Sequence, residues 1–537
     1  MLVQKIGPSR SSIQEGLFGG KRAMNGAEAV IRTLLAGGID TCFTNPGTSE
    51  MHLVAALDRA PEMRCVLALF EGVVTGAADG YARMSGKPAS TLLHLGPGFA
   101  NGMANLHNAS RARVPMVNLI GQHPAYHLRY DAPLTSDVEA IARPLSKWLR
   151  TSISVGVLSR DTADAVLNAR TPPGQIATLI IPTDVAWSEG ASVAPVASPA
   201  QSAMPEATRI ERAAAMLRSG RKTAILIGGS ALFDDGLTAA GKIAAATGAI
   251  LFAPYPFARW RHGAGTPVLE RVAYVLEQAS EQFKDCEQLI LVGSDAPVSY
   301  FAYEGKSSIP TPPSCEIFAL AHPNENGIGA LVALMEDLSA KSAAASVEKL
   351  DRPPEPYGEI TLVGLAAAIA ATLPENAVVA DESMTSGRGI LNAARGCPPH
   401  DWLACTGGSI GIAIPLAVGA AVACADRPVL CLTADGSGMY TLQALWTMAR
   451  EGLHVVTVVF ANRAYGVLKR EFSNLGIGEA GARAKALFDI GRPDLDWVSL
   501  ARGMGVPAAR VTGLGEFTAA LKNGYAGEGP CLIEVSL

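Results

Sequence analysis

Two oxygen-bearing side chains follow neighbouring predicted strands near the C-terminus. The apolar run 428–434 is a predicted strand that leads into Asp435, and a helical pattern follows it. The next apolar run ends at Asn462, 27 residues after Asp435. In a strand–helix–strand unit, the carboxyl ends of both strands lie at one edge of a parallel sheet. We therefore expect Asp435 and Asn462 to lie close together.

The chemistry of this pair is that of a metal-bridged phosphate site. Carboxylate and amide oxygens suit Mg²⁺, which completes its octahedron with waters and phosphate oxygens. The free N–H groups at the start of the helix after Asp435 also favour an anion. The alternative is that Asp435 caps its helix and that Asn462 belongs to an unrelated turn.

A carboxylate in the N-terminal part of the chain also lies between a predicted strand and a predicted helix, as Asp435 does. The apolar run 65–70 is a predicted strand, and Glu71 directly follows it and opens a helix. Glu71 can be an acid–base group, or it can be an ordinary first-turn carboxylate that interacts with the helix dipole. The residues alone leave both possibilities open.

Together these segments resemble the thiamine diphosphate enzymes. The interval from Asp435 to Asn462 is similar to the family's GDG-to-NN motif, with Ala434 and Arg463 as departures from it. An alanine replaces the first glycine acceptably if its φ is negative. The resemblance implies that Asp435, Asn462 and the backbone carbonyl of Ala464 bind Mg²⁺.

The same resemblance assigns the other cofactor contacts. The string from Glu71 to Arg83 is similar to the signature around the glutamate that activates the cofactor's aminopyrimidine. Ile410 would support the bend of the cofactor, and the carbonyl of Gly408 would accept from its amine. Thr385 is preferred over Ser383 as the hydroxyl of a second diphosphate loop. The remaining implied cofactor contacts are Pro46, Asn101, Gly436 and Ser437.

Over residues 24–537 the chain most resembles the benzoylformate decarboxylase branch of this family. That resemblance implies His94 as a catalytic histidine, although a hydrogen-bonded structural histidine is the alternative. It also suggests His262 as a second catalytic histidine, on a looser alignment. A histidine pair with pKa values near 6.5 suits proton transfer. The implied substrate pocket contains Thr48, Gln122, Val467 and Glu471.

The resemblance predicts decarboxylation of a 2-keto acid with thiamine diphosphate and Mg²⁺. The product carbon would be protonated to an aldehyde or joined to a second carbonyl. A carboxylate at Glu471 disfavours a phenyl group unless it points away or pairs with Arg470, so we expect a substrate other than benzoylformate. The alternatives are an acetolactate synthase-like carboligase, suggested by Gly121-Gln122, and a non-catalytic homologue that only binds the cofactor.

The elements that must position these residues fall into three segments. Two Ala-, Ser- and Pro-rich stretches separate predicted domains at 24–190, 205–342 and 358–537, and residues 1–23 are a predicted extension. Each domain alternates apolar strand patterns with helical ones, which predicts three α/β domains with doubly wound parallel sheets. The central segment 223–236 lacks the glycine pattern of a dinucleotide site, so FAD is not expected.

Composition excludes several classes of partner. The net charge is −5, which offers no positive field for nucleic acid. Residues 402–425 carry no charge, but Gly407, Gly408, Gly411 and Pro415 interrupt the run, so we expect a buried loop and helix rather than a membrane span. Nine scattered cysteines favour a reducing, cytoplasmic setting. The family resemblance implies a homotetramer built from homodimers, with each active site shared between two subunits.

Overall fold

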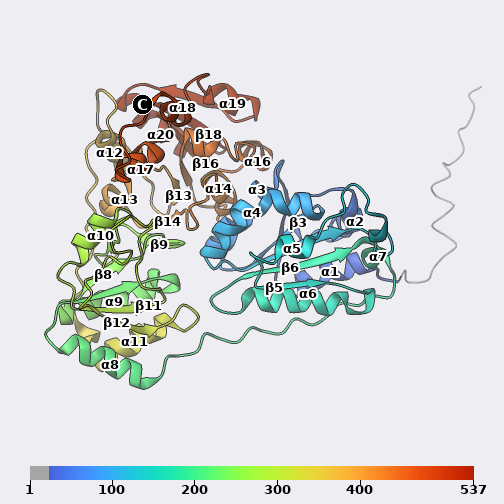
Figure 1. The fold of residues 1–537 in the computed structure, drawn as a ribbon, viewed down its shortest axis with the longest axis horizontal. Coiled ribbons are helices and arrows are strands. Elements are labelled where there is room, and N and C mark those ends of the chain that lie inside the picture. Colours follow the sequence, from blue (N-terminus) through green and yellow to red (C-terminus); the bar gives the residue numbers. More distant parts are fainter. Residues whose placement is uncertain (1–22) are drawn as a thin grey trace, which may run out of the picture.

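The computed structural model describes residues 23–537, so the predicted extension lies outside the described residues except at its last position. Three α/β domains follow one another along the chain, as the sequence predicts (Figure 1). The first domain lies on the right in this view, the second at the lower left and the third above it.

The first domain has a six-stranded parallel sheet. Helices cover its faces, so most of its strand residues are buried (Figure 1). The strand order is β2 (Arg64–Leu67), β1 (Thr41–Asn45), β3 (Ala89–Leu93), β4 (Met116–Gln122), β6 (Ile176–Pro182) and β5 (Trp148–Thr151). The helices are α1 (Gly26–Ala36), α2 (Met51–Asp58), α3 (Glu71–Ser85), α4 (Leu95–Arg111), α5 (Val138–Ala142), α6 (Val155–Arg170) and α7 (Thr183–Trp187).

The second domain has a five-stranded parallel sheet. Its order is β10 (Glu270–Arg271), β8 (Ile250–Ala253), β7 (Thr223–Ile227), β11 (Gln288–Val292) and β12 (Glu316–Ala321). The helices of this segment are α8 (Ala207–Arg218), α9 (Asp234–Thr247), α10 (Leu276–Phe283) and α11 (Gly327–Asp337).

The third domain has a seven-stranded sheet, and one of its strands comes from the middle of the chain. The order is β17 (Ala508–Val511), β18 (Cys531–Ser536), β16 (Val455–Ala461), β15 (Val429–Ala434), β13 (Val378–Glu382), β14 (His400–Ala404) and β9 (Arg259–His262). The helices are α12 (Leu362–Thr372), α13 (Ile390–Ala393), α14 (Ala413–Ala423), α15 (Asp435–Gly438), α16 (Ala444–Glu451), α17 (Gly466–Asn474), α18 (Ala482–Phe488), α19 (Trp497–Gly503) and α20 (Leu514–Ala526).

The borrowed strand β9 pairs antiparallel with β14, which departs from the all-parallel sheet that the sequence predicts. A buried carboxylate accounts for this pairing. Asp401 on β14 accepts from Arg259 and Arg261 of β9, at 2.7 and 3.2 Å, and from Arg427 at 2.6 Å. Burial acts to raise the pKa of Asp401, but the charge of Arg259 and the hydrogen bonds from Arg259 and Arg427 outweigh burial and lower it.

We expect Asp401→Asn to loosen the attachment of β9 and to reduce the free energy of unfolding by about 3 kcal/mol at pH 7. Because the folded-state pKa of Asp401 is depressed below 3.8, the ion pairs contribute above pH 3.8 and are lost as pH falls through the folded value. Thermal unfolding at pH 7 and at pH 3 should therefore show a difference between variant and wild type that shrinks in acid. An equal difference at both pH values would contradict this account.

Helices α3 and α14 pack directly on each other and join the first and third domains. Two glycines allow the close approach: a Cβ at Gly80 would lie 2.1 Å from the carbonyl oxygen of Leu416, and one at Gly419 would lie 1.9 Å from that of Ala77. Such distances exclude any side chain. Gly80 of the predicted signature therefore serves helix packing.

The uncharged run 402–425 forms β14, a turn and α14, all largely buried. Within residues 23–537, no helix has both the length and the apolar character that crossing a bilayer requires.

Candidate active site

The first half of the candidate site lies where β1, β3 and β4 end. His94 follows β3, and its Nδ1 lies 2.8 Å from Oε2 of Glu50, a fully buried residue of the 3₁₀ turn Thr48–Glu50. The same carboxylate oxygen accepts from the backbone N–H of Gly47 at 2.8 Å. Burial raises the pKa of Glu50, although the proximity of His94 opposes this rise. Glu50 was not predicted as a site residue. The one feature of the sequence that points to it is its place at the end of the turn 45–50, NPGTSE.

Glu71 lies beside His94. It is buried at the first position of α3, and its Oε2 accepts from the side-chain amide of Asn101 at 3.0 Å. A Cβ at Gly98 would lie 3.2 Å from Glu71 Oε1 and 3.2 Å from His94 Cβ, so this glycine leaves the space between the two side chains open. The structure thus brings Glu71, at the start of α3, together with His94 and Asn101, which lie just before and within α4.

Pro46, Thr48 and Gln122 are at the same edge of the sheet. Pro46 and Thr48 follow β1, and Gln122 is the last residue of β4. Thr48 is exposed and Gln122 is buried, with its side-chain oxygen accepting from His123 N–H at 2.8 Å. The expected substrate-facing residues of the first domain therefore border the Glu71–His94 pair.

The second half of the candidate site lies at the carboxyl ends of β15 and β16. Asp435 is buried, and its two oxygens accept from Gly436 N–H at 2.8 Å and Arg463 N–H at 2.7 Å. Asn462 Oδ1 accepts from Ala464 N–H at 3.0 Å. Burial raises the pKa of Asp435, and the two backbone donors oppose that rise. The expected closeness of Asp435 and Asn462 is confirmed by the bond from Arg463.

The two departures from the family motif are both accommodated. Ala434 has φ −94°, so its methyl group causes no strain. Arg463 donates its backbone N–H to Asp435, whereas its guanidinium donates to Asp494 at 2.9 Å. Its φ of +56° is unusual for a non-glycine residue.

The loop after β13 borders this half. Thr385 lies close to Gly466, the first residue of α17: a Cβ built at Gly466 would be 2.8 Å from the hydroxyl oxygen of Thr385. The hydroxyl of Ser383 instead donates to Asp381 at 2.5 Å and is buried. Ser386, which was not predicted, accepts from the Asn462 amide at 3.3 Å. The geometry favours Thr385 over Ser383 as a free hydroxyl.

The turn between β14 and α14 carries Gly408 and Ile410. Gly408 has φ +75°, and a Cβ there would lie 2.7 Å from the hydroxyl of Tyr300, so both conformation and space require glycine. Glu382 holds the end of this turn, accepting from Gly411 and Ala413 N–H at 2.9 and 3.3 Å. Burial raises the pKa of Glu382 to about 8. The sequence did not predict this role of Glu382, because its partners Gly411 and Ala413 are about 30 residues away and no local pattern connects them to it.

Val467 and Glu471 share one face of α17, because they are four residues apart. Glu471 accepts from the Tyr303 hydroxyl at 2.8 Å, so it pairs with a tyrosine of the central segment rather than with Arg470. Burial, followed by the bond to Glu471, raises the pKa of Tyr303 to about 12.

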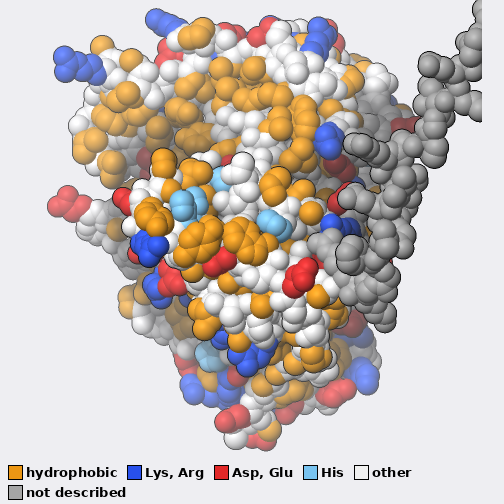
Figure 2. All heavy atoms as spheres, turned by 90° about the vertical axis from the view of Figure 1, so that its right-hand side faces the viewer, with side chains coloured by type: hydrophobic (Ala, Val, Ile, Leu, Met, Phe, Trp, Pro, Cys, Tyr) orange, Lys and Arg blue, Asp and Glu red, His pale blue; other side chains and the backbone are white. Residues whose placement is uncertain are grey.

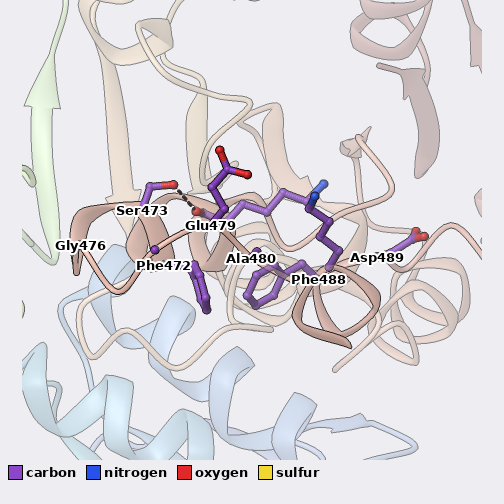
Figure 3. A pocket seen from close by; sticks show the side chains of 10 residues that line it. Phe472, Ser473, Gly476, Glu479, Ala480, Phe488 and Asp489 are labelled. Atoms are coloured by element: carbon purple, nitrogen blue, oxygen red, sulfur yellow. Dashed lines mark hydrogen bonds between the residues drawn. The ribbon is translucent and has the colours of Figure 1, made fainter. Parts of the chain in front are cut away.

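A pocket of about 950 Å³ lies on the other side of α17 (Figure 3). It is lined by residues of α17, α18 and the loop between them, including Phe472, Phe488 and Asp489. None of the predicted site residues lines it. Its lining nevertheless reaches the second half of the candidate site, because Asp489 pairs with Ala464 and Phe488 accepts from Tyr465 N–H at 2.9 Å.

The structure does not bring His262 to the other candidate residues. His262 pairs with His400 at the amino end of β14, whereas Gly408 and Ile410 follow the carboxyl end of that strand. It is buried, and its ring packs against Trp260 and His400 with centroids 4.7 and 5.2 Å away. Burial, with a contribution from His400, lowers the pKa of His262 well below 6.5. These surroundings are those of a core histidine.

The donor set at Asp435 fits Mg²⁺ and a diphosphate. Among residues 23–537 no group of three or more His, Cys, Asp or Glu side chains could hold a metal ion. The set at Asp435 has one carboxylate, with amide and backbone oxygens beside it. An ion there would need further oxygens from a bound phosphate, which is the usual coordination of Mg²⁺ at phosphate sites.

Comparisons with known proteins agree with this arrangement. Residues 24–141 match the family model "Thiamine pyrophosphate enzyme, N-terminal TPP binding domain", and residues 389–535 match its C-terminal counterpart. The chain is 51% identical to the "Putative acetolactate synthase large subunit IlvX" of Mycobacterium tuberculosis, over 95% of this chain and 99% of that protein. It is 27% identical to a benzoylformate decarboxylase of Pseudomonas aeruginosa, over 93% and 96% of the two chains.

Solved structures show the same fold. A thiamine diphosphate-dependent 4-hydroxybenzoylformate decarboxylase of Rhodococcus jostii superposes with a TM-score of 0.81 at 24% identity, over 96% of this chain and 99% of that chain. A benzoylformate decarboxylase of Polynucleobacter necessarius gives 0.83 at 20% identity, with the same coverage. The two matching family models and the near full-length relative at 51% identity show that this chain belongs to the thiamine pyrophosphate enzyme family.

Proposed function

We propose that this chain is a thiamine diphosphate- and Mg²⁺-dependent enzyme that decarboxylates a 2-keto acid. The observation that carries the proposal is that one chain has two groups of suitable residues at strand ends. The first domain has a buried Glu71 beside His94, and the third domain has the Asp435–Asn462 oxygen cluster. When bound, the cofactor supplies an electron acceptor for the pair left behind by CO₂.

The residues around this chemistry have distinct tasks. Glu71, buried and held by Asn101, would share a proton with the pyrimidine ring nitrogen. Asp435, Asn462 and the carbonyl of Ala464 would hold Mg²⁺, with Gly436, Ser437 and Thr385 near the diphosphate. Gly408 and Ile410 would fix the pyrimidine and the bend. His94, oriented by Glu50, would move protons on the substrate side.

The decisive experiment combines cofactor binding with product analysis. Thiamine diphosphate should raise the thermal unfolding temperature of the cofactor-free protein only when Mg²⁺ is present. The holoenzyme should then release CO₂ from at least one of pyruvate, a branched 2-keto acid and benzoylformate, each tested with and without an acceptor aldehyde. Binding without CO₂ release from any of them would favour the non-catalytic alternative.

A carboligase outcome is the second candidate function. The 51% identical relative carries the name of an acetolactate synthase subunit, and the buried Gln122 ends β4 in the Gly-Gln pair that suggested this branch. The same assay separates the two outcomes, because a carboligase converts part of the substrate to a hydroxyketone. A colourless preparation would agree with the expected lack of FAD.

For the substrate pocket we propose that the Tyr303–Glu471 pair disfavours an apolar acyl group beside Val467. Glu471→Leu should raise kcat/KM for benzoylformate by about tenfold. In the wild type, a phenyl group bound beside Glu471 must displace water from its carboxylate, and leucine removes this cost. Steady-state kinetics with benzoylformate and pyruvate measure the effect. The control is Tyr303→Phe, which keeps the carboxylate and should not improve benzoylformate. Equal effects of both variants would refute this role.

The dimer-based homotetramer and the cytoplasmic location stay predictions. The face of the molecule in Figure 2 shows histidine side chains among exposed hydrophobic ones. In the first domain, the segment after β4 exposes Tyr126, Leu128, Tyr130 and Leu134. Such a patch is typical of surfaces that are covered in an assembly. Sedimentation of the holoenzyme tests the oligomeric state.

A further inference from the structure

We propose that His123 is the second histidine that transfers protons on the substrate side of the active site, together with His94. This inference rests on the proposed function. It assigns to the end of β4 a task that sequence comparison had suggested for His262, which the structure leaves in the core of the third domain's sheet.

The sheet topology places the two histidines on adjacent strand ends. Strands β3 and β4 are parallel neighbours, and Leu93 pairs with Ile120. His94 directly follows Leu93, and His123 lies three residues after Ile120. Since neighbouring strands are about 4.8 Å apart, both histidines lie beyond the same edge of the sheet on adjacent strands.

The carboxylate of Glu50 lies between the two strand ends. Its Oε2 contacts His94, and a Cβ at Gly121 would lie only 1.8 Å from its Oε1. Glycine at this position therefore makes room for the carboxylate over the end of β4. Among the residues that the structure describes, Glu50 Oε1 has no hydrogen-bond partner, although it is buried.

His123 has an unused ring nitrogen of its own. Its Nε2 is also buried without a hydrogen-bond partner within residues 23–537. A buried polar atom without a partner is costly, so such atoms commonly mark groups that bind something in the working protein. One unpaired atom is thus on Glu50, which contacts His94, and the other is on His123 at the end of the adjacent strand, and we interpret them as parts of one proton-handling cluster.

The surroundings of His123 favour its neutral form. Burial, then the charges of His127 and His94, lower its pKa below the ordinary 6.5. The ring of His127 lies 5.4 Å away, and Asp184 of α7 accepts from Ala125 N–H in the same loop. The titratable groups that face this cluster are thus His94, Glu50, His127 and Asp184. A neutral imidazole near physiological pH can both accept and return a proton.

The proton balance gives the two histidines separate tasks. The keto oxygen gains a proton when its carbon is attacked, and it loses that proton when the aldehyde carbonyl forms again. In its protonated form His123 gives this proton to the keto oxygen, and in its neutral form it takes the proton back when the carbonyl forms, so its charge is restored over each cycle. The electron pair of the broken C–CO₂⁻ bond takes up one proton from solvent through His94. Overall, R–CO–CO₂⁻ and H⁺ give R–CHO and CO₂.

The kinetic test uses the holoenzyme with His123→Asn and His123→Gln. We expect kcat for the accepted 2-keto acid to fall about 100-fold in both variants, with loss of one limb of the kcat pH profile. The cofactor-dependent thermal shift should be unchanged. His322→Asn, in an exposed position outside the site, is the matched control and should keep wild-type kcat. A kcat within twofold of wild type in either folded His123 variant would overturn the proposal.

A second measurement does not depend on turnover. Hydrogen–deuterium exchange at histidine C2, followed by mass spectrometry across a pH series, gives the pKa of His123 in the full-length holoenzyme. We expect a value below 6.5, and a rise in His94→Gln because the neighbouring charge is removed. A pKa of His123 that is insensitive to His94→Gln would also overturn the proposal. If the wild type releases no CO₂ from any 2-keto acid, the proposed function fails, and the exchange experiment still decides whether the two histidines are coupled.

Discussion

Glu71→Gln is expected to lower kcat about 10³-fold while the protein still folds and binds its cofactor. The glutamate is buried at the start of α3, and one of its oxygens already accepts from Asn101. Glutamine keeps a carbonyl oxygen for that bond but cannot exchange a proton with a ring nitrogen. Single-turnover and steady-state CO₂ release measure the loss, and the Mg²⁺-dependent thermal shift reports binding.

Glu62→Gln is the matched control for this prediction. Glu62 is exposed in the segment before β2, so the same chemical change there should leave kcat at the wild-type level. If Glu71→Gln retained near-normal turnover, proton exchange through Glu71 would be excluded and the proposed mechanism would be lost, although cofactor binding through the third domain could still be correct.

Asp435→Asn should abolish Mg²⁺-dependent retention of the cofactor. The substitution removes the one carboxylate of the oxygen cluster but keeps its size, and a side-chain oxygen remains for one of the two backbone donors, Gly436 and Arg463. Without the charge, the site loses its main attraction for a divalent ion. The thermal shift produced by cofactor and Mg²⁺ should disappear, and with it the activity after gel filtration.

The control is Asp426→Asn, an exposed position just before β15. It should keep the full thermal shift. The pH dependence gives a further check: because burial raises the pKa of Asp435 above 3.8, protonation competes with the metal at higher pH than for a free aspartate. Retention by wild type should therefore decline as pH falls toward that raised value. A normal thermal shift in Asp435→Asn would contradict the metal assignment.

Much of the fold follows from local patterns in the sequence. The apolar runs that end at Ala434 and Ala461 are buried strands in the structure, and their parallel pairing follows from the helix between them. Strand β9 could not be predicted in the same way. It joins the third domain through Asp401, a residue about 140 positions away, and no local pattern encodes such a partner.

The candidate site likewise has features that follow from local sequence patterns and features that depend on long-range packing. Local patterns are enough to place Glu71, Asp435 and Asn462 at strand ends, because a strand pattern followed by a polar turn is a local property of the chain. Which side chains meet follows from the folded arrangement. There Glu471 accepts from Tyr303, His262 lies in the core, and the end of β4 that carries His123 lies next to the end of β3 that carries His94. Strand order in a parallel sheet is fixed by packing between helices and strands far apart in sequence, and spacing along the chain does not record it.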